Sequence, residues 1–152
     1  MKVLIGVHHF PPVYRGAEWR AHRLASALQE AGHEASVICV ERIDDAQAAP
    51  LAYADEVFEG VAVRRLSFDL GAAPDPLHWE YDNLWVGEHL RQVFDERKPD
   101  LFHLIGGYLL TGSAARCPTG WAPNSCYADR LLVSLSPLLH AAHRWCYLHA
   151  AD

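Results

Sequence analysis

The sequence lacks a long hydrophobic run, so a membrane-spanning helix is not expected. No uninterrupted apolar stretch approaches the roughly 20 residues that cross a bilayer as a helix. The chain enters the apolar segment 3–7 directly, without the charged start, apolar core and cleavage site of a signal peptide. The sequence therefore predicts a protein of the cytoplasm.

Cysteine and positive charge are also scarce. The four cysteines, at 39, 117, 126 and 146, form no Cys-x-x-Cys pair, so neither a secreted disulfide framework nor a zinc cluster is expected. Lys and Arg number 13 against 19 Asp and Glu, a net charge of −6, which argues against general nucleic-acid affinity. We predict no metal, no cofactor and no nucleic-acid partner.

Sequence motifs of the common catalytic sites are missing as well. The chain has no Gly-x-Ser-x-Gly elbow, no Walker loop and no legible Ser-His-Asp arrangement. No catalytic residue is therefore assigned from the sequence.

The first forty residues have the pattern of a strand, a loop, a helix and a second strand. Residues 3–7 are apolar and mostly β-branched, as in a strand buried on both faces. Two prolines keep the next loop from becoming helix, and Gly32 ends the expected helix 18–31, where a left-handed residue costs least. Residues 34–40 are again apolar, so this stretch predicts a β-α-β unit.

The same alternation continues along a chain long enough for one domain. Further strands are expected at 60–66 and 101–105, and helices at 77–98 and from Leu109 onward. The segments 44–55 and 71–76 are polar or rich in Gly and Pro, and we expect loops there, the first with at most a short helix. The pattern predicts an α/β, Rossmann-like parallel sheet.

Three short motifs in the β-α-β unit carry a family resemblance. They are Phe10-Pro11-Pro12, Gly16-Ala17-Glu18 and Gly32-His33-Glu34. Leu24, Ala25 and Leu28, which lie between the second and third motifs, contribute to the same resemblance. Together they resemble the start of the N-terminal domain of a family 4 glycosyltransferase, of the retaining GT-B class. The family usually has two adjacent glycines, and here Arg15 takes the place of the first.

The strand 101–105 adds to this resemblance. Residues 99–103 read Pro-Asp-Leu-Phe-His, which is similar to the Pro-Asp-Val-Val-His-x-His that the family often has there. Ile105 stands where the second histidine is common. The resemblance covers about residues 1–116.

The resemblance implies a fold of two facing Rossmann-like domains, the first binding the acceptor and the second the nucleotide sugar. Residues 1–116 would be the acceptor-side domain, an incomplete GT-B fold that is inactive alone. The implied partners are a nucleotide sugar, bound through the other domain, and a sugar or lipid-linked acceptor. Peripheral membrane contact is common in such enzymes, although no basic amphipathic stretch argues for it here.

Arg15 and Gly16 are the candidates for contact with the donor's phosphates. A helix that begins after a glycine offers free N–H groups and a partial positive charge to an anion. Arg15 would add a charge-assisted hydrogen bond. The alternative is that Gly16 only permits a tight turn, and Glu18 is then simply a first-turn acid favoured by the helix dipole.

Candidates for acceptor binding follow the first and fourth expected strands, where open α/β sheets bind ligands. They are His9, His103, Gly106 and Tyr108. Adjacent strand residues point to opposite faces, so His8 and His9 are expected to be a poor metal pair. His103 lies in an apolar strand and has a second interpretation, as a core histidine.

Residues 117–152 depart from the pattern. They contain no Lys, Glu or Ile. Synonymous codons can be chosen for residues 129–137 so that the same bases, translated in a frame shifted by one base, give Thr-Asp-Phe-Trp-Phe-Leu-Cys-Pro. This is close to a motif, Thr-x-His-Asp-Tyr-Trp-Phe-Leu-Cys-Pro-Arg, that the family has after its fifth strand. We hypothesise that the chain from about Cys117 is translated out of frame; the alternative is an ordinary, divergent pair of helices.

Two other functions remain open on the sequence alone. A stand-alone nucleotide- or dinucleotide-binding domain would need Gly-x-Gly-x-x-Gly after the first strand and an acid after the second. Here the first loop is longer and rich in proline, although Glu41 follows the second expected strand. A regulatory receiver domain would place an acidic pair where His8 and His9 stand.

Overall fold

A parallel-dominated sheet forms the centre of the part of the chain that the structure describes. The computed structural model describes residues 1–12, 15–43, 51–106, 108–115 and 126–128. Within these residues, the six strands run in the order β3-β4-β2-β1-β5-β6. All neighbours are parallel except β3 and β4. This confirms the predicted α/β, Rossmann-like class.

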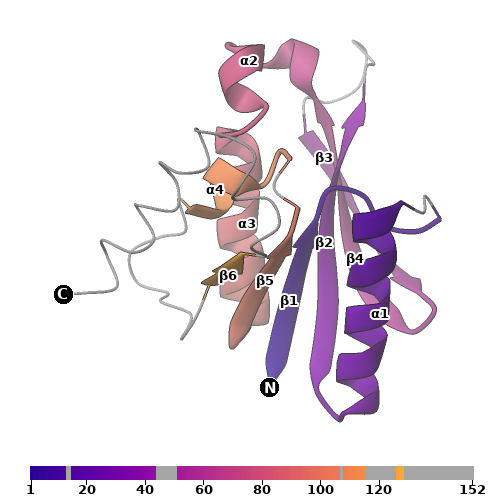
Figure 1. The fold of residues 1–152 in the computed structure, drawn as a ribbon. Coiled ribbons are helices and arrows are strands. Elements are labelled where there is room, and N and C mark those ends of the chain that lie inside the picture. The colour runs from indigo at the N-terminus through magenta and orange to yellow at the C-terminus, as the bar shows by residue number, and fades with distance from the viewer. Residues whose placement is uncertain (13–14, 44–50, 107, 116–125, 129–152) are drawn as a thin grey trace.

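Strands and helices alternate along most of the described chain (Figure 1). The strands are β1 (Lys2–Val7), β2 (Glu34–Ile43), β3 (Leu51–Phe58), β4 (Val61–Asp69), β5 (Leu101–Ile105) and β6 (Cys126–Ala128). The helices are α1 (Gly16–Glu30), α2 (Pro76–Trp79), α3 (Leu84–Arg97) and α4 (Thr111–Ala115), with a short 3₁₀ turn, η1, at Leu70–Ala72. None of these helices is long and apolar enough to cross a membrane.

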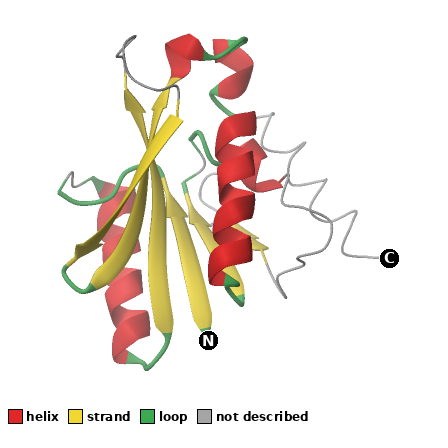
Figure 2. Ribbon diagram, turned by 180° about the vertical axis from the view of Figure 1, so that it is seen from behind, coloured by secondary structure: helices red, strands yellow, loops and turns green. Residues whose placement is uncertain are grey.

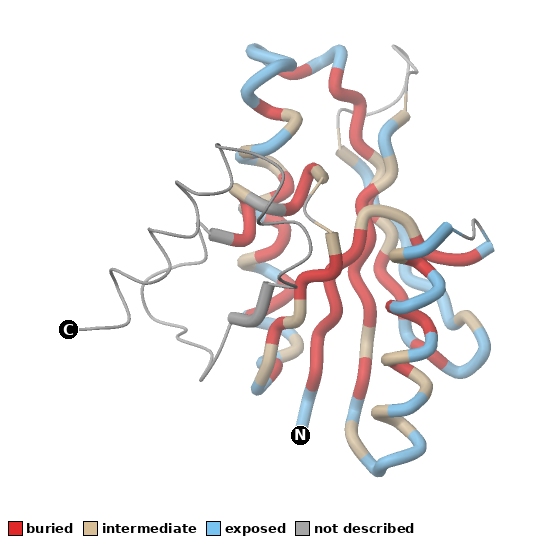
Figure 3. The backbone as a smooth tube through the Cα atoms, viewed as in Figure 1, coloured by how far each residue is buried: buried red, intermediate tan, exposed pale blue. Residues whose placement is uncertain are grey.

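Helices cover both faces of the sheet, with α1 on one side and α3 on the other (Figure 2). Alternate residues of β1 enter the two cores, since Leu4 packs toward α3 while Val3 and Ile5 pack toward α1. The central strands are therefore buried along nearly their whole length (Figure 3). This burial explains their continuous apolar sequences.

The prediction of a loop at 44–55 is wrong for its last residues, because β3 begins at Leu51 and pairs antiparallel with β4. Six of its eight residues are exposed, so the strand carries no apolar periodicity that the sequence could reveal. A two-residue turn joins the strands, with φ of 46° at Glu59 and 84° at Gly60, as tight hairpins require. Residues 44–50 lie outside the described part.

The expected single helix at 77–98 is divided into α2 and α3. Asn83 caps the start of α3, since its side-chain oxygen accepts a hydrogen bond from the Val86 N–H at 3.0 Å. The Ser113 hydroxyl binds both the N–H and the C=O of Asn83, at 3.1 and 2.8 Å. A contact with α4, distant in sequence, thus completes the break between the two helices.

Three residues of the atypical C-terminal segment extend the sheet. Cys126–Ala128 form β6, which pairs parallel with β5 in the register Phe102 opposite Cys126. The alternation therefore reaches further than the sequence pattern predicted. Residues 116–125 and 129–152, including most of the segment predicted to be out of frame, lie outside the described residues.

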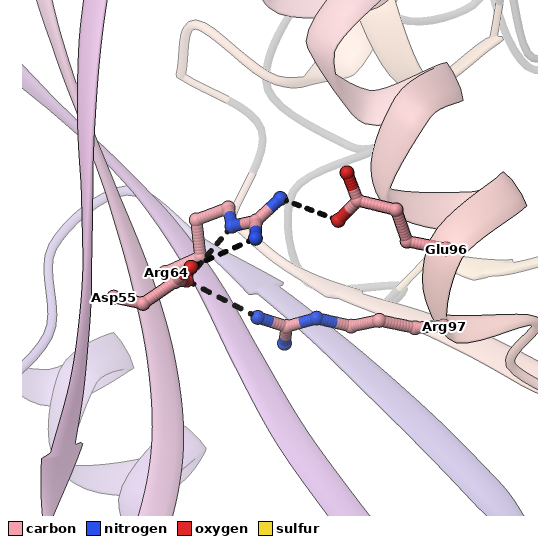
Figure 4. A network of polar contacts seen from close by, with 4 residues as sticks. All are labelled: Asp55, Arg64, Glu96 and Arg97. Atoms are coloured by element: carbon pink, nitrogen blue, oxygen red, sulfur yellow. Dashed lines mark hydrogen bonds and ion pairs between the residues drawn. The ribbon is translucent and has the colours of Figure 1, made fainter.

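An ion-pair network joins the β3–β4 hairpin to α3 (Figure 4). The largely buried Arg64 guanidinium binds both carboxylate oxygens of Asp55 at 2.8 Å and Glu96 at 2.9 Å. Arg97 lies 3.5 Å from Asp55. Hydrogen bonding from Arg64 holds the pKa of Asp55 below its ordinary value of 3.8. The network orients the edge hairpin, which also contacts the loop after β1.

Replacing Asp55 with Asn is expected to lower the free energy of unfolding at pH 7 by about 1–2 kcal/mol, allowing for screening at this half-exposed carboxylate. Because the folded-state pKa of Asp55 is depressed, its contribution is present above pH 3.8 and lost as the pH falls through the lower, folded value. Urea denaturation at pH 7 and pH 2.5 measures this.

The matched control is Glu88→Gln, which alters an exposed carboxylate paired with Arg91 on α3. It should leave the urea midpoint nearly unchanged. An Asp55→Asn loss of equal size at both pH values would contradict the electrostatic origin of the effect.

Candidate functional site

The candidate site lies where β1, β2 and β5 end. These strands are parallel neighbours, so their carboxyl ends meet at one edge of the sheet, and open α/β sheets bind ligands at this edge. In Figure 1 the edge faces the end of the molecule that carries α2, away from the N-terminus. Side chains from four separate segments converge there.

Four aromatic rings stand in sequence across this edge, and we call them the ring row. His9 and His8 have centroids 3.8 Å apart, His8 meets Tyr108 edge-on at 4.5 Å, and Tyr108 meets Tyr81 edge-on at 6.5 Å. His8 and His9 follow β1, Tyr108 follows β5, and Tyr81 lies between α2 and α3. The ring row thus joins three parts of the chain.

The expectation that His8 and His9 point to opposite faces is wrong. That argument holds only within a strand, and the chain bends at His8, directly after β1. The His8 carbonyl accepts a hydrogen bond from the Val40 N–H of β2 at 3.0 Å, which fixes the bend. The two imidazoles are therefore neighbours.

His8 is an uncharged imidazole at neutral pH. Burial, followed by the charges of His9 and Arg15, lowers its pKa from 6.5 to about 4. Its Nε2 atom is buried and has no hydrogen-bond partner among the described residues. A buried polar atom without a partner is uncommon in folded proteins and draws attention to this position.

Tyr108 connects the ring row to two charged side chains. Burial, followed by the neighbouring Glu80 carboxylate, raises the pKa of its hydroxyl above the ordinary 10, and Arg42, near the end of β2, acts in the opposite direction. The backbone supports this arrangement, because the Leu109 N–H donates to the Glu80 carbonyl at 3.1 Å. The phenol therefore lies near both an anionic and a cationic side chain.

The two residues predicted to contact donor phosphates begin α1. Arg15 is its N-cap and is exposed, and no side chain caps the helix there. A Cβ atom on Gly16 would meet nothing within 4 Å, so the tight-turn explanation of this glycine finds no steric support among the described residues. No described atom therefore fills the space beside Gly16 at the first turn of α1.

Glu18 differs from an ordinary first-turn acid. It is only 4% exposed, and its Oε2 atom has no hydrogen-bond partner among the described residues. It lies on the side of α1 that also buries Ala21, His22 and Ala25. The helix dipole favours an acid at this position, but does not explain its burial.

The remaining predicted residues have different positions. Gly106 follows β5 with φ of 78°, a conformation that favours glycine, and it turns the chain toward Tyr108. His103 lies in the middle of β5, opposite Ile5 of β1, on the sheet face to which Leu101 and Ile105 contribute. The structure thus brings His9 and Tyr108 together through His8, while His103 lies away from the strand ends.

Arg65 is a feature of the site that the sequence analysis missed. From β4 it donates to the Phe10 carbonyl at 3.1 Å and to the Pro11 carbonyl, and Glu56 of β3 binds its guanidinium at 2.6 Å. It therefore clamps the loop that joins the ring row to α1. The sequence offered one signal for this role, the opposite charges of Arg65 and Glu56 on the two strands of a hairpin. This signal could not be used because β3 was not predicted.

Replacing Arg65 with Met is expected to cost about 2 kcal/mol of unfolding free energy, since two loop carbonyls lose a charged donor. Hydrogen exchange should accelerate at the amides of His9 and Phe10, as measured by NMR. The control is Arg23→Met, an exposed arginine on α1, which should change neither quantity. Unaltered exchange in the Arg65 variant would show that the clamp does not order the loop.

The comparison with known protein families gives one match. The model of the family described as a glycosyl transferase 4-like domain matches residues 15–151. The match begins at Arg15 and includes most of the segment after residue 116. No curated protein and no solved structure matches the chain significantly.

Proposed function

Because the chain belongs to the glycosyl transferase 4-like family, we propose that it is the acceptor-binding part of a glycosyltransferase of the GT-B type. In this reaction a sugar moves from a nucleotide-sugar donor to an acceptor. The observation that carries the assignment of the acceptor is the ring row with its partners Arg42 and Glu80, at the ligand-binding edge of the sheet.

The chemistry of the ring row suits an acceptor. Imidazole, phenol and carboxylate groups together both donate and accept hydrogen bonds, and the rings add apolar surface. Binding sites of this kind combine apolar walls with a few placed polar groups. In the proposed function, His9 and Tyr108 contact the acceptor, Gly106 shapes the turn beside them, and His103 has no direct part.

The donor's phosphates are assigned to the start of α1. The exposed Arg15 and the free N–H groups that follow Gly16 offer positive charge and hydrogen-bond donors. Arg15 is one of the charges that lower the pKa of His8. Phosphates at α1 and an acceptor at the ring row would therefore be neighbours, as transfer requires.

In the proposed function, a second domain that faces this edge makes most of the contacts with the donor. We expect the 152-residue chain by itself to bind ligands weakly and to transfer no sugar. Detection of sugar transfer from UDP-glucose or GDP-mannose by the purified chain would overturn this part of the proposal.

The test of the site is an NMR titration of the ¹⁵N-labelled chain. The probes are UDP-glucose, GDP-mannose, methyl glycosides, geranyl phosphate and NAD. We expect UDP-glucose or GDP-mannose to shift the amides of residues 15–17, and a methyl glycoside or geranyl phosphate to shift those of 8–9 and 108–110. Tight binding of NAD would instead favour the dinucleotide-binding alternative and contradict the proposed function.

A further inference from the structure

We propose that the ring row is a platform for an uncharged sugar, so that the acceptor is recognised as a carbohydrate and not by a phosphate group. This inference rests on the proposed function and specifies the acceptor class of the same site. It is carried by ring geometry, by the hydrogen-bonding groups beside the rings and by the distribution of charge.

The first argument is the exposed aromatic surface at the end of the row. The Tyr81 side chain is 48% exposed although its ring contacts Tyr108 edge-on. An edge-on contact leaves a ring face uncovered, and such a face packs against the C–H groups of a sugar ring through dispersion. His9 and Tyr108 are also partly exposed, which extends this surface along the sheet edge.

The second argument is the set of polar groups next to the rings. The Glu80 carboxylate and the Arg42 guanidinium lie near enough to the Tyr108 hydroxyl to influence its pKa. Sugar hydroxyls both donate and accept, so they match a mixed set of donors and acceptors. The unpartnered Nε2 of His8 is a further group that a hydroxyl would satisfy.

The third argument is electrostatic. His8 is uncharged and so provides no positive charge for an anion. Glu80 lies beside Tyr108 and would repel a phosphate, while the charge of Arg42 is shared with this network. Arg15, which is exposed and lies on the α1 side of His8, is the better place for an anion. The edge therefore separates into an anion-binding start of α1 and a ring row in which His8 carries no charge.

The experiment compares Tyr81→Ala with Tyr81→Phe in the full chain. The uncharged probes are methyl glycosides and a disaccharide, and the phosphate-bearing probes are geranyl phosphate and inorganic phosphate. NMR titration measures the affinity for each. We expect Tyr81→Ala to weaken binding of the preferred sugar about five- to tenfold and Tyr81→Phe to change it less than about twofold, because the ring supplies the contact.

The matched control is Tyr53→Ala, which removes an exposed tyrosine (58%, against 48% for Tyr81) whose ring contacts His89 of α3 and not the ring row. It should leave sugar affinity unchanged. If geranyl phosphate binds at the ring row and no sugar does, the carbohydrate inference fails while the proposed function stands. If only NAD binds there, the proposed function itself fails. Absence of any sugar binding also overturns the inference.

Discussion

Replacing Phe10 with alanine is expected to lower the free energy of unfolding by about 3–5 kcal/mol. Phe10 is fully buried between α1 and the sheet, although it belongs to a loop. Its ring meets His22 edge-on at 5.9 Å and Phe58 at 6.0 Å. Removing it would leave a cavity beneath the loop that carries His8 and His9, and urea denaturation measures the loss.

The conservative variant Phe10→Leu is the control. It fills most of the same volume and should cost much less than the alanine variant. Because Phe10 anchors the loop, the alanine variant should also broaden the NMR signals of His8 and His9. Equal stability of the two variants would show that Phe10 is not a packing anchor.

Replacing Gly112 with alanine is expected to cost about 3 kcal/mol, because a Cβ atom there would clash with Tyr81 and Asp82. It would lie 2.6 Å from the Tyr81 carbonyl oxygen and 2.8 Å from the Asp82 Cβ. The Gly112 N–H also donates to that carbonyl at 2.8 Å. α4 would have to move away from the α2–α3 junction, and with it the support of Tyr81 in the ring row.

The nearby Gly87 provides a matched control with the opposite sign. A Cβ atom at this position in α3 would meet its closest neighbours, all from Ser113, at 3.7 Å, an ordinary contact. Gly87→Ala should therefore stabilise the protein by roughly 0.5–1 kcal/mol, since alanine favours helix over glycine. Thermal unfolding of both variants tests the pair, and destabilisation by both would contradict the steric explanation.

The reading frame after residue 116 stays a prediction. The family match extends through this segment, and β6 adds three of its residues to the sheet. The nucleotide sequence from codon 110 onward, read in all frames, is the direct test. A long open frame containing Thr-Asp-Phe-Trp-Phe-Leu-Cys-Pro would support the shift, and an immediate stop in that frame would refute it.

The sequence by itself determined the β-α-β core and the family. β1, α1 and β5 were predicted closely because apolar residues repeat locally with the period of each element. The motifs around Phe10, Gly16 and Gly32 are contiguous, so they remain legible without any knowledge of tertiary contacts. Arg15, Gly16, His9, Gly106 and Tyr108 were predicted as site residues because each stands near the end of a strand or the start of a helix, and their roles stay predictions.

Only the tertiary structure decided which side chains meet. β3 has no apolar periodicity and exists through its pairing with β4, and the division between α2 and α3 depends on Ser113 of α4. The pairing of His8 with His9 and the clamp by Arg65 depend on a bend and on a hairpin that bring distant residues together. Local patterns specify which face of an element is buried, whereas such contacts depend on the register and packing of elements far apart in the sequence.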